Sequence, residues 1–272
     1  MAFLRSIALR ARRHLPEKVA DRVIERAVAT YGRVFSASLP ETRFAIIMQG
    51  RAGSALLCDL LDQHSAIRCQ TDELLEKPVS RPIEYLNGMA CYYNAGAWGV
   101  KIKLSQIEHQ PSVDNPVDFL HELRDEGFKL FSLTRRNAFL GTLSVIAAYK
   151  RGKYHRIEAR PNEAFRRISI TDPAYFVKKI GERERARVAL LKATAGLTDM
   201  DLCYEDDLLE PERQRQASYT LFSHLGLEPM NVESSFKRIA GPRLSDTVTN
   251  AEELWKAVEN SPYAGFLSEV SL

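Results

Sequence analysis

The sequence predicts a single α/β domain: a parallel sheet flanked by helices, with a helical insertion and a helical C-terminal part. Short apolar runs alternate with segments of helical period, and a glycine-containing turn joins the first run to the first helix. The composition of 45% hydrophobic and 27% charged residues is typical of a soluble globular protein. For a chain of 272 residues, we expect one large domain at residues 41–272 after an N-terminal helical arm at residues 1–40.

Four buried strands are expected, because four apolar runs of strand length lie between segments of helical period. They cover residues 44–48, 98–104, 128–134 and 200–204. Helices are expected to begin near Ser54 and to cover residues 117–124, 137–150, 174–194 and 211–224. In an open parallel sheet, ligands bind beyond the carboxyl ends of the strands, so the residues that follow these runs are the candidates for function.

The formal net charge of +3 is the sum of two unlike parts. Residues 1–16 hold four arginines and no acid, which leaves a balance of −1 for the rest of the chain. A net charge this small does not indicate a nucleic-acid partner. The arm also has apolar residues at helical spacing, a pattern that fits either a helix docked on the domain or peripheral contact with an anionic membrane surface.

Several absences in the sequence favour a cytoplasmic protein. The arm lacks the apolar run of about 7 to 15 residues of a secretory signal, and no run of ~18 apolar residues occurs elsewhere. Cys58, Cys69, Cys91 and Cys203 form no CxxC pair and have no companion histidine at metal-ligand spacing, which predicts reduced packing residues and no metal site. The inner face of a membrane is the alternative location, because of the basic arm.

The turn after the first predicted strand has the residues of an anion site. It reads Gly50-Arg51-Ala52-Gly53-Ser54, so two glycines allow a tight turn and an arginine supplies charge. The N–H groups and the dipole at the start of the next helix favour a phosphate there. The nucleoside-triphosphate P-loop needs GxxxxGK[ST], and this turn lacks that lysine, which weakens the case for a kinase. A purely structural glycine turn is a further alternative.

Residues 51–58 resemble the RSGSTLL loop of the sulfotransferase superfamily, which holds the 5′-phosphosulfate end of 3′-phosphoadenylyl sulfate (PAPS). Residues 133–137, with Ser144 eight residues after Arg136, resemble that family's motif for the 3′-phosphate of PAPS. An arginine at a strand end offers forked donors, and a serine two turns into the next helix adds a hydroxyl to the same anion. The spacing to Ser144 favours Arg136 over Arg135.

The resemblance implies a P-loop-like sheet, PAPS as donor, adenosine 3′,5′-bisphosphate as product and no metal. The cofactor-binding residues that it implies are Arg51, Ala52, Gly53, Ser54, Ala55, Arg136 and Ser144. The family usually has hydroxyl side chains at two of these positions, Ala52 and Ala55. Two hydrogen bonds to the phosphosulfate are therefore missing, each worth about 1.5–3 kcal/mol if it is charge-assisted. Weaker similarity at residues 98–101, 152–155 and 204–206 points to the bacterial carbohydrate and glycolipid type.

Sulfuryl transfer needs positive groups where charge builds on the leaving phosphate. We choose Arg51 and Lys101 as these catalytic cations. Lys103 is the alternative to Lys101, because alternation along the strand places both lysines on one face.

The transfer also needs a base for the acceptor proton. In several members of the family, a catalytic glutamate follows the loop arginine by about 21 residues, an offset that falls here on Asp72. We choose Glu73, one residue further, with Asp72 and His64 as alternatives.

The function predicted is transfer of the sulfuryl group from PAPS to a hydroxyl of a carbohydrate or glycolipid. A non-catalytic member that binds nucleotide or a partner is the alternative, and a small-molecule kinase is a weaker one. The acceptor pocket is expected in the variable segments 76–97 and 150–173, where Tyr85, Tyr92, Tyr93 and Trp98 either stack on a sugar ring or pack in the core. The sequence does not indicate an oligomeric state.

Overall fold

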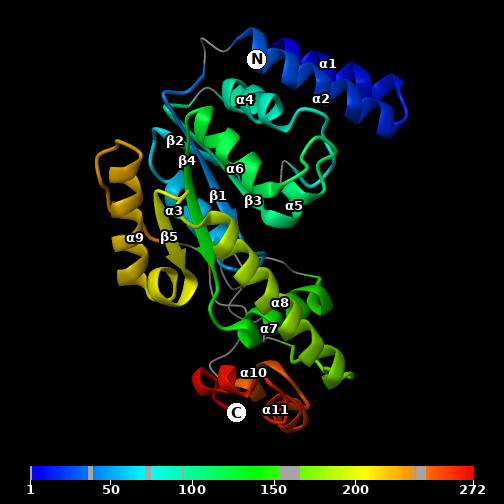
Figure 1. Ribbon diagram of the computed structural model, residues 1–272, viewed down its shortest axis with the longest axis vertical. Helices are drawn as coiled ribbons and strands as arrows, with labels where there is room; N and C mark the ends of the chain where they lie inside the picture. The colour runs from blue at the N-terminus through cyan, green and yellow to red at the C-terminus, as the bar shows by residue number, and fades with distance from the viewer. Residues whose placement is uncertain are drawn as a thin grey trace.

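The computed structural model describes residues 2–35, 39–70, 75–93, 95–152, 166–234, 236 and 243–272. In Figure 1, a parallel sheet in the order β2-β3-β1-β4-β5 runs through the upper part of the molecule. The strands are β1 (Thr42–Met48), β2 (Ile67–Gln70), β3 (Ala97–Lys103), β4 (Phe128–Thr134) and β5 (Met200–Cys203). The predicted α/β class with a parallel sheet flanked by helices is confirmed.

Helices cover both faces of the sheet and form the part of the chain after β5. They are α1 (Ala2–His14), α2 (Glu17–Val34), α3 (Ser54–Asp62), α4 (Pro82–Tyr93), α5 (Leu104–Glu108), α6 (Pro116–Asp125), α7 (Ala138–Arg151), α8 (Pro173–Thr194), α9 (Pro211–His224), α10 (Leu244–Thr247) and α11 (Ala251–Glu259). A π-helical turn, Tyr204–Leu208, follows β5, and a 3-10 helix, Ala264–Glu269, follows α11. In the described part of the chain, no helix is long and apolar enough to cross a membrane.

Alternation along the central strand β1 builds two cores. Phe44 and Ile46 pack on one face of the sheet with residues of α3 and α9, whereas Ala45 and Ile47 pack on the other with residues of α4 and α6. All four side chains are fully buried, as expected for the central strand of a sheet that is covered on both faces. A third core joins α7, α8 and α11 below the sheet.

The elements that were not predicted individually include the strand β2 and the helix α4. β2 has only four residues and only two of them, Ile67 and Cys69, are apolar, so its sequence carries little strand signal. α4 contains Gly88, which weakens helical propensity but allows a close crossing. A Cβ on Gly88 would lie 2.0 Å from the carbonyl oxygen of Val28 in α2, and one on Gly32 would lie 2.4 Å from the Gly88 nitrogen.

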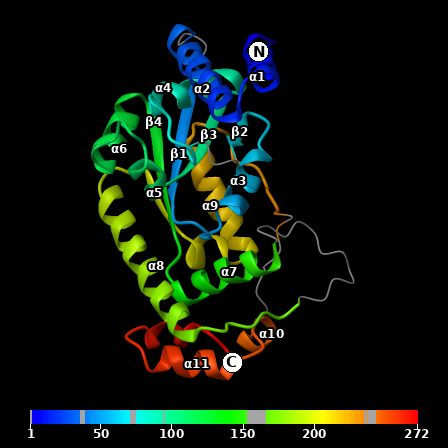
Figure 2. The same cartoon turned by 90° about the vertical axis from the view of Figure 1, so that its right-hand side faces the viewer.

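The N-terminal arm is therefore docked on the domain. α2 lies across α4, and α1 packs along α2. Figures 1 and 2 both place α1 and α2 at one end of the molecule, and α7, α8 and α11 toward the other end. The strands run from the first end toward the second, so the loops at their carboxyl ends lie near α7 and α8 (Figure 2).

Candidate functional site

The turn between β1 and α3 presents an uncapped helix start. Gly53 is the N-cap residue of α3, with a φ of 93°, and no side chain caps the helix. The N–H groups of Ser54, Ala55 and Leu56 have no backbone acceptor among the described residues, and the first bond of the helix runs from Leu57 N to Gly53 O at 3.0 Å. Free N–H groups at a helix start are donors for an anion.

Arg51 holds this turn in a strained conformation. Of the non-glycine residues that the structure describes, Arg51 alone has a positive φ, of 63°. Such a conformation costs about 1–3 kcal/mol and persists where neighbouring groups fix it. Here the carbonyl of Gly50 accepts a hydrogen bond from Arg183 Nη2 at 2.6 Å, and the carbonyl of Arg51 accepts one from Arg135 Nη1 at 3.5 Å. The carbonyls of the turn thus face cations.

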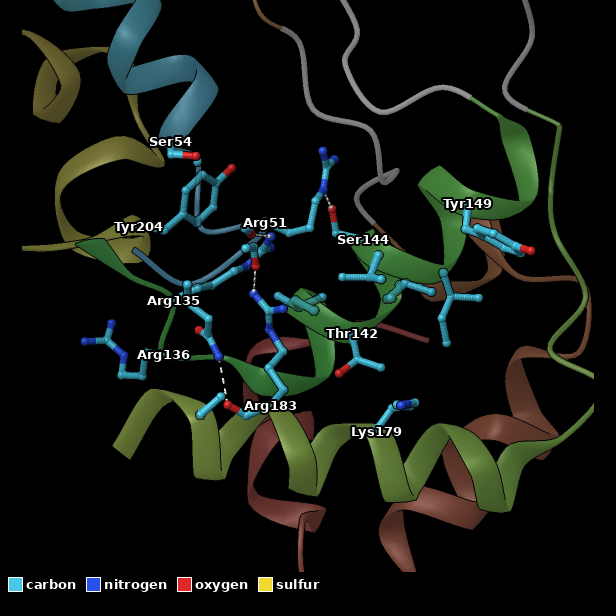
Figure 3. Close-up of a pocket in the computed structure, with 18 of the residues that line it drawn as sticks. Arg51, Ser54, Arg135, Arg136, Thr142, Ser144, Tyr149, Lys179, Arg183 and Tyr204 are labelled. Atoms are coloured by element: carbon cyan, nitrogen blue, oxygen red, sulfur yellow. Dashed lines mark hydrogen bonds between the residues drawn. The ribbon is translucent and has the colours of Figure 1, made fainter. Parts of the chain in front are cut away.

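Three arginines gather around the turn, from three different elements. Arg51 donates from Nε to Ser144 Oγ of α7 at 3.2 Å, and Figure 3 shows these two side chains pointing toward one another. Arg135, at the end of β4, stacks over the ring of Tyr204 at 4.6 Å from its centroid. Arg183 reaches the turn from α8 (Figure 3). A ligand with several negative charges would be held by forked donors from three sides.

Arg183 was not predicted from the sequence. Burial and then the charges of Arg135 and Arg51 lower the pKa of its guanidinium to about 9. Its Nε atom is buried with no hydrogen-bond partner in the structure. The side chain passes directly over Gly141 of α7, where a Cβ would lie 2.1 Å from Nε. A cation in this environment is destabilised until an anion binds beside it.

Lys101 and Lys103 project from β3 into the same space. Both line a cavity of about 1650 Å³ together with Arg51, Arg135 and Arg183. Lys101 is only 6% exposed, and no hydrogen bond or ion pair is formed by its ammonium group with any residue that the structure describes. The side chain of Lys103 passes over Gly50, 3.4 Å from the position of a Cβ. The predicted alternation therefore holds, since both lysines face the cavity.

Glu205 is the least exposed of the five described carboxylates that line this cavity, with 9% of its side chain exposed. Glu205 accepts hydrogen bonds from the backbone N–H groups of Arg136 at 2.9 Å and Asn137 at 3.2 Å, and it lies 3.6 Å from Arg135 Nε. These donors fix Glu205 at the start of α7. Glu205 therefore orients Arg135 and the strand end.

Arg136 and Ser144, which the resemblance assigns to one phosphate, contact different residues in the structure. Arg136 forms a two-pronged ion pair with Asp206, at 2.8 and 2.9 Å, and it points away from Ser144 in Figure 3. The hydrogen bonds that Arg136 donates to Asp206 raise the pKa of Arg136. Ser144 instead contacts Arg51. The carboxylate that follows β5 thus holds the arginine that the motif assigns to the 3′-phosphate.

The remaining loop residues differ in their exposure to the cavity. Ala52 is fully buried in the core between β1 and α3, so its side chain does not reach a ligand. Ser54 and Ala55 line the cavity. Of the family hydroxyls that the loop lacks, only the one at Ala55 would face the cavity.

Of the three candidate bases, the structure describes only His64. Glu73 and Asp72 lie outside the described residues. His64 follows the C-terminal end of α3, the end opposite the turn, where its ring is tilted against that of Phe222 with the centroids 5.1 Å apart. Its Nδ1 accepts a hydrogen bond from Ala66 N at 3.2 Å, which is a local role in the connection to β2.

The aromatic residues proposed for an acceptor pocket pack elsewhere. Trp98 is fully buried, and Tyr85 and Tyr93 pack on the core beside α4. Two other tyrosines line the cavity and are exposed, Tyr149 of α7 at 75% and Tyr175 of α8 at 50%. Their exposed rings are available to stack on a ligand.

The cysteines and metal ligands add no further site. The four cysteines are free thiols, three of them buried and Cys203 half-buried, with the pKa of Cys203 raised by burial to about 11. Across the described ranges, no group of three or more His, Cys, Asp or Glu side chains is placed to hold a metal ion.

Comparison with known proteins gives structural likeness only, and it is remote. No family model matches the chain, and no curated protein matches it. Among solved structures, a sulfotransferase from Alicyclobacillus acidocaldarius is similar to this chain, with 13% sequence identity and a TM-score of 0.47 over 85% of this chain and 95% of that one. A likeness of this degree carries no argument about ligand or reaction, for which the residues of the cavity are the basis.

Proposed function

We propose that this protein is a sulfotransferase that moves the sulfuryl group of PAPS to a hydroxyl of a carbohydrate or glycolipid. The observation that carries the proposal is an excess of positive charge in one cavity beside an uncapped helix start. Of the residues that the structure describes, nine arginine and lysine side chains line the cavity, among them Arg51, Lys101, Arg135 and Arg183, against five carboxylates, of which Glu205 is the least exposed. The similarity of the loop and strand-end motifs to those of sulfotransferases supports the same ligand.

The residues of the cavity fit PAPS at both of its charged ends. The free N–H groups of α3 and Arg51 suit the phosphosulfate end, because a helix start and a forked cation both favour a phosphate. Arg135 and Arg183 supply donors for a second anion such as the 3′-phosphate. The buried Nε of Arg183 and the ammonium of Lys101 have no partner among the described residues, which an anion would provide.

The chemistry of the transfer assigns roles to three side chains. When bound, PAPS supplies a sulfuryl group joined to a phosphate oxygen. The acceptor oxygen forms a bond to sulfur as that sulfur–oxygen bond breaks, and the acceptor proton passes to a carboxylate, for which we propose Glu73. Lys101 and Arg51 stabilise the negative charge that builds on the released phosphate oxygen.

The exposed rings of Tyr149 and Tyr175 support a carbohydrate acceptor. Both tyrosines line the cavity and keep 75% and 50% of their surface exposed. Aromatic rings with one free face suit the apolar side of a sugar ring. We therefore propose that α7 and α8 hold the acceptor.

Thermal unfolding with three nucleotides tests the donor. Adenosine 3′,5′-bisphosphate should stabilise the chain by about 2.7 kcal/mol at a hundred times its dissociation constant. Adenosine 5′-monophosphate, which lacks the second anion, should do so at much higher concentration only. Stabilisation by MgATP without stabilisation by the bisphosphate would contradict the proposal and favour the kinase.

A transfer assay tests the reaction itself. With labelled PAPS and a panel of carbohydrates and glycolipids, the chain should label at least one acceptor. Glu73→Gln should slow this transfer by about 100-fold or more while the affinity for the bisphosphate stays within about twofold, because a general base acts on the acceptor. Tight binding of the bisphosphate with no transfer to any acceptor would favour the non-catalytic alternative.

A further inference from the structure

The outer side of α2 carries exposed arginines and valines in one stripe. α2 packs on α4 through Val28 and Gly32. The other side of the helix is exposed, with Val19 at 45% and Val23 at 38%. The exposed residues of the stripe are Val19, Arg22, Val23, Arg26, Thr30 and Arg33. Their spacing of three and four residues places them on one face of the helix.

The acids of α2 lie on a different side. Glu17, Asp21 and Glu25 follow one another at intervals of four residues, so they share a face that is separate from the stripe. Asp21 is paired with Lys77 at 2.7 Å, and Glu25 accepts hydrogen bonds from Ser80 N at 2.7 Å and Ser80 Oγ at 2.6 Å. The stripe therefore contains no carboxylate of its own helix.

α1, which packs beside α2, also has exposed basic and apolar residues. It buries Leu4 and Ala11 and exposes Leu9, at 64%, with Arg10 and Arg13. The sequence of α1 contains no acid. Figures 1 and 2 show α1 and α2 side by side at the end of the molecule. We call the exposed residues of α1 and the stripe of α2 together the basic face.

We propose that the basic face docks on a membrane surface that contains anionic lipid. Arginine side chains are attracted to anionic headgroups, and exposed aliphatic side chains between them insert at the boundary of headgroups and acyl chains. Both kinds of residue are present here on adjacent helices. A nucleic acid would use the arginines alone and leave Leu9, Val19 and Val23 in water, so the apolar residues favour lipid.

The placement of the basic face sets what docking can do. The cavity lies near α7 and α8 at the carboxyl ends of the strands, whereas the basic face lies at their opposite end (Figure 2). Docking would therefore locate the protein at a membrane and leave the cavity away from the bilayer. This inference does not depend on the proposed transfer reaction.

Sedimentation with lipid vesicles tests the proposal on the full chain. The protein should bind vesicles of phosphatidylcholine and phosphatidylglycerol and should not bind phosphatidylcholine alone. Raising the salt concentration should weaken binding, because the attraction is screened. Equal binding to both vesicles, or binding to neither, would overturn the proposal. Salt-sensitive binding to duplex DNA without binding to anionic vesicles would assign the face to nucleic acid instead.

Matched variants locate the contact. The triple variant Arg22→Gln, Arg26→Gln, Arg33→Gln should weaken vesicle binding by roughly 100-fold, since each arginine near an anionic surface contributes a factor of about five. The control removes the same charge from exposed lysines of α8 and α11, as Lys178→Gln, Lys192→Gln, Lys256→Gln. Equal binding of the two triple variants would overturn the assignment to this face.

A second pair of substitutions separates insertion from charge alone. Val19→Ser with Val23→Ser leaves the arginines in place and should still weaken binding several-fold, because apolar area leaves the headgroup boundary. Unchanged vesicle binding of this double variant would overturn the part of the proposal that assigns lipid insertion. Both side chains are exposed, so folding is expected to be retained, and the thermal unfolding midpoint checks this directly.

Discussion

The cavity and the basic face both gather arginines, and the two regions differ in what surrounds them. In the cavity, Arg183 donates to the carbonyl of Gly50, and burial lowers its pKa to about 9. On the basic face, Arg22 and Arg26 are exposed and have no hydrogen bond or ion pair with a residue that the structure describes. The same side chain is therefore preorganised at one end and solvated at the other.

Because of this difference, the two regions would recognise an anion in different ways. Buried donors of fixed direction select a ligand by shape and charge, and water screens them little. Exposed donors respond to the field of an extended charged surface and lose their effect at high salt. Net charge describes neither region, because the +3 of the whole chain hides an acid-free α1 and a cavity lined, in the described part of the chain, by nine cations and five carboxylates.

The largest effect expected is the loss of transfer in Lys101→Met. Lys101 is 6% exposed and faces the cavity, so its removal should slow transfer by about 100-fold or more. The unliganded protein should become no less stable, because a buried charge without a partner is costly. Turnover and the thermal unfolding midpoint test the two halves. The control Lys178→Met should change neither, and transfer by Lys101→Met within about threefold of wild type would shift the role to Lys103.

The turn itself should be the next most sensitive position. A Cβ on Gly53 would lie 2.7 Å from Tyr204 Cδ2 at a φ of +93°, so Gly53→Ala should cost about 3 kcal/mol of unfolding free energy. Gly196→Ala is the control, because its φ of +74° adds strain with no atom within 4 Å. It should cost about 1 kcal/mol in the same urea titration. Equal costs would mean that the contact with Tyr204 relaxes freely.

The pH dependence of the free energy of unfolding, measured for wild type and Arg183→Met, tests whether Arg183 is buried as a cation. Burial lowers the pKa of Arg183 in the folded chain to about 9, below its value in the unfolded chain. Above pH 9 the unfolded chain binds the extra proton, so this residue's contribution to stability rises with pH there. The stability of wild type minus that of Arg183→Met should therefore increase above pH 9. A flat difference would contradict the buried state of Arg183.

Much of the fold was predictable because buried parallel strands are continuous apolar runs. β1, β3, β4 and β5 lie within one or two residues of their predicted positions. β2 was not predicted, because an edge strand of four residues has too few apolar side chains to be distinguished from a loop. The packing of α2 on α4 was not predicted, because the close crossing depends on Gly32 and Gly88 together, and these two glycines are far apart in the sequence.

The site was predictable where a motif and a strand end coincide. Arg51 follows the first predicted strand, Lys101 lies within the second, and both line the cavity. Arg183 was not predicted as a site residue, because the sequence around it in the middle of α8 is typical of a solvated helix face. Only the tertiary packing of α8 against the turn places it beside Gly50. Such cations from distant elements leave no local pattern.

The smallest effect expected is on Arg136, and it decides how the strand-end motif is used. Arg136 and Asp206 are 50% and 56% exposed, so Arg136→Ala should cost no more than about 0.5 kcal/mol of stability. Arg136 lowers the pKa of Asp206, so this contribution is present above the unfolded pKa of Asp206 and is lost as the pH falls through its lower folded value. Measuring the free energy of unfolding of wild type and Arg136→Ala above and below the pH range in which Asp206 titrates tests this ion pair.

Titration with adenosine 3′,5′-bisphosphate then tests the ligand role of the same residue. If Asp206 keeps Arg136, the affinity of Arg136→Ala should fall by less than about threefold, whereas Arg135→Ala should lose about tenfold or more, because Arg135 contacts the turn. A tenfold loss in Arg136→Ala instead would mean that Arg136 leaves Asp206 for the 3′-phosphate. The exposed ion pair would then be a resting partner for an arginine that binds the nucleotide, and Asp206→Asn should strengthen that binding.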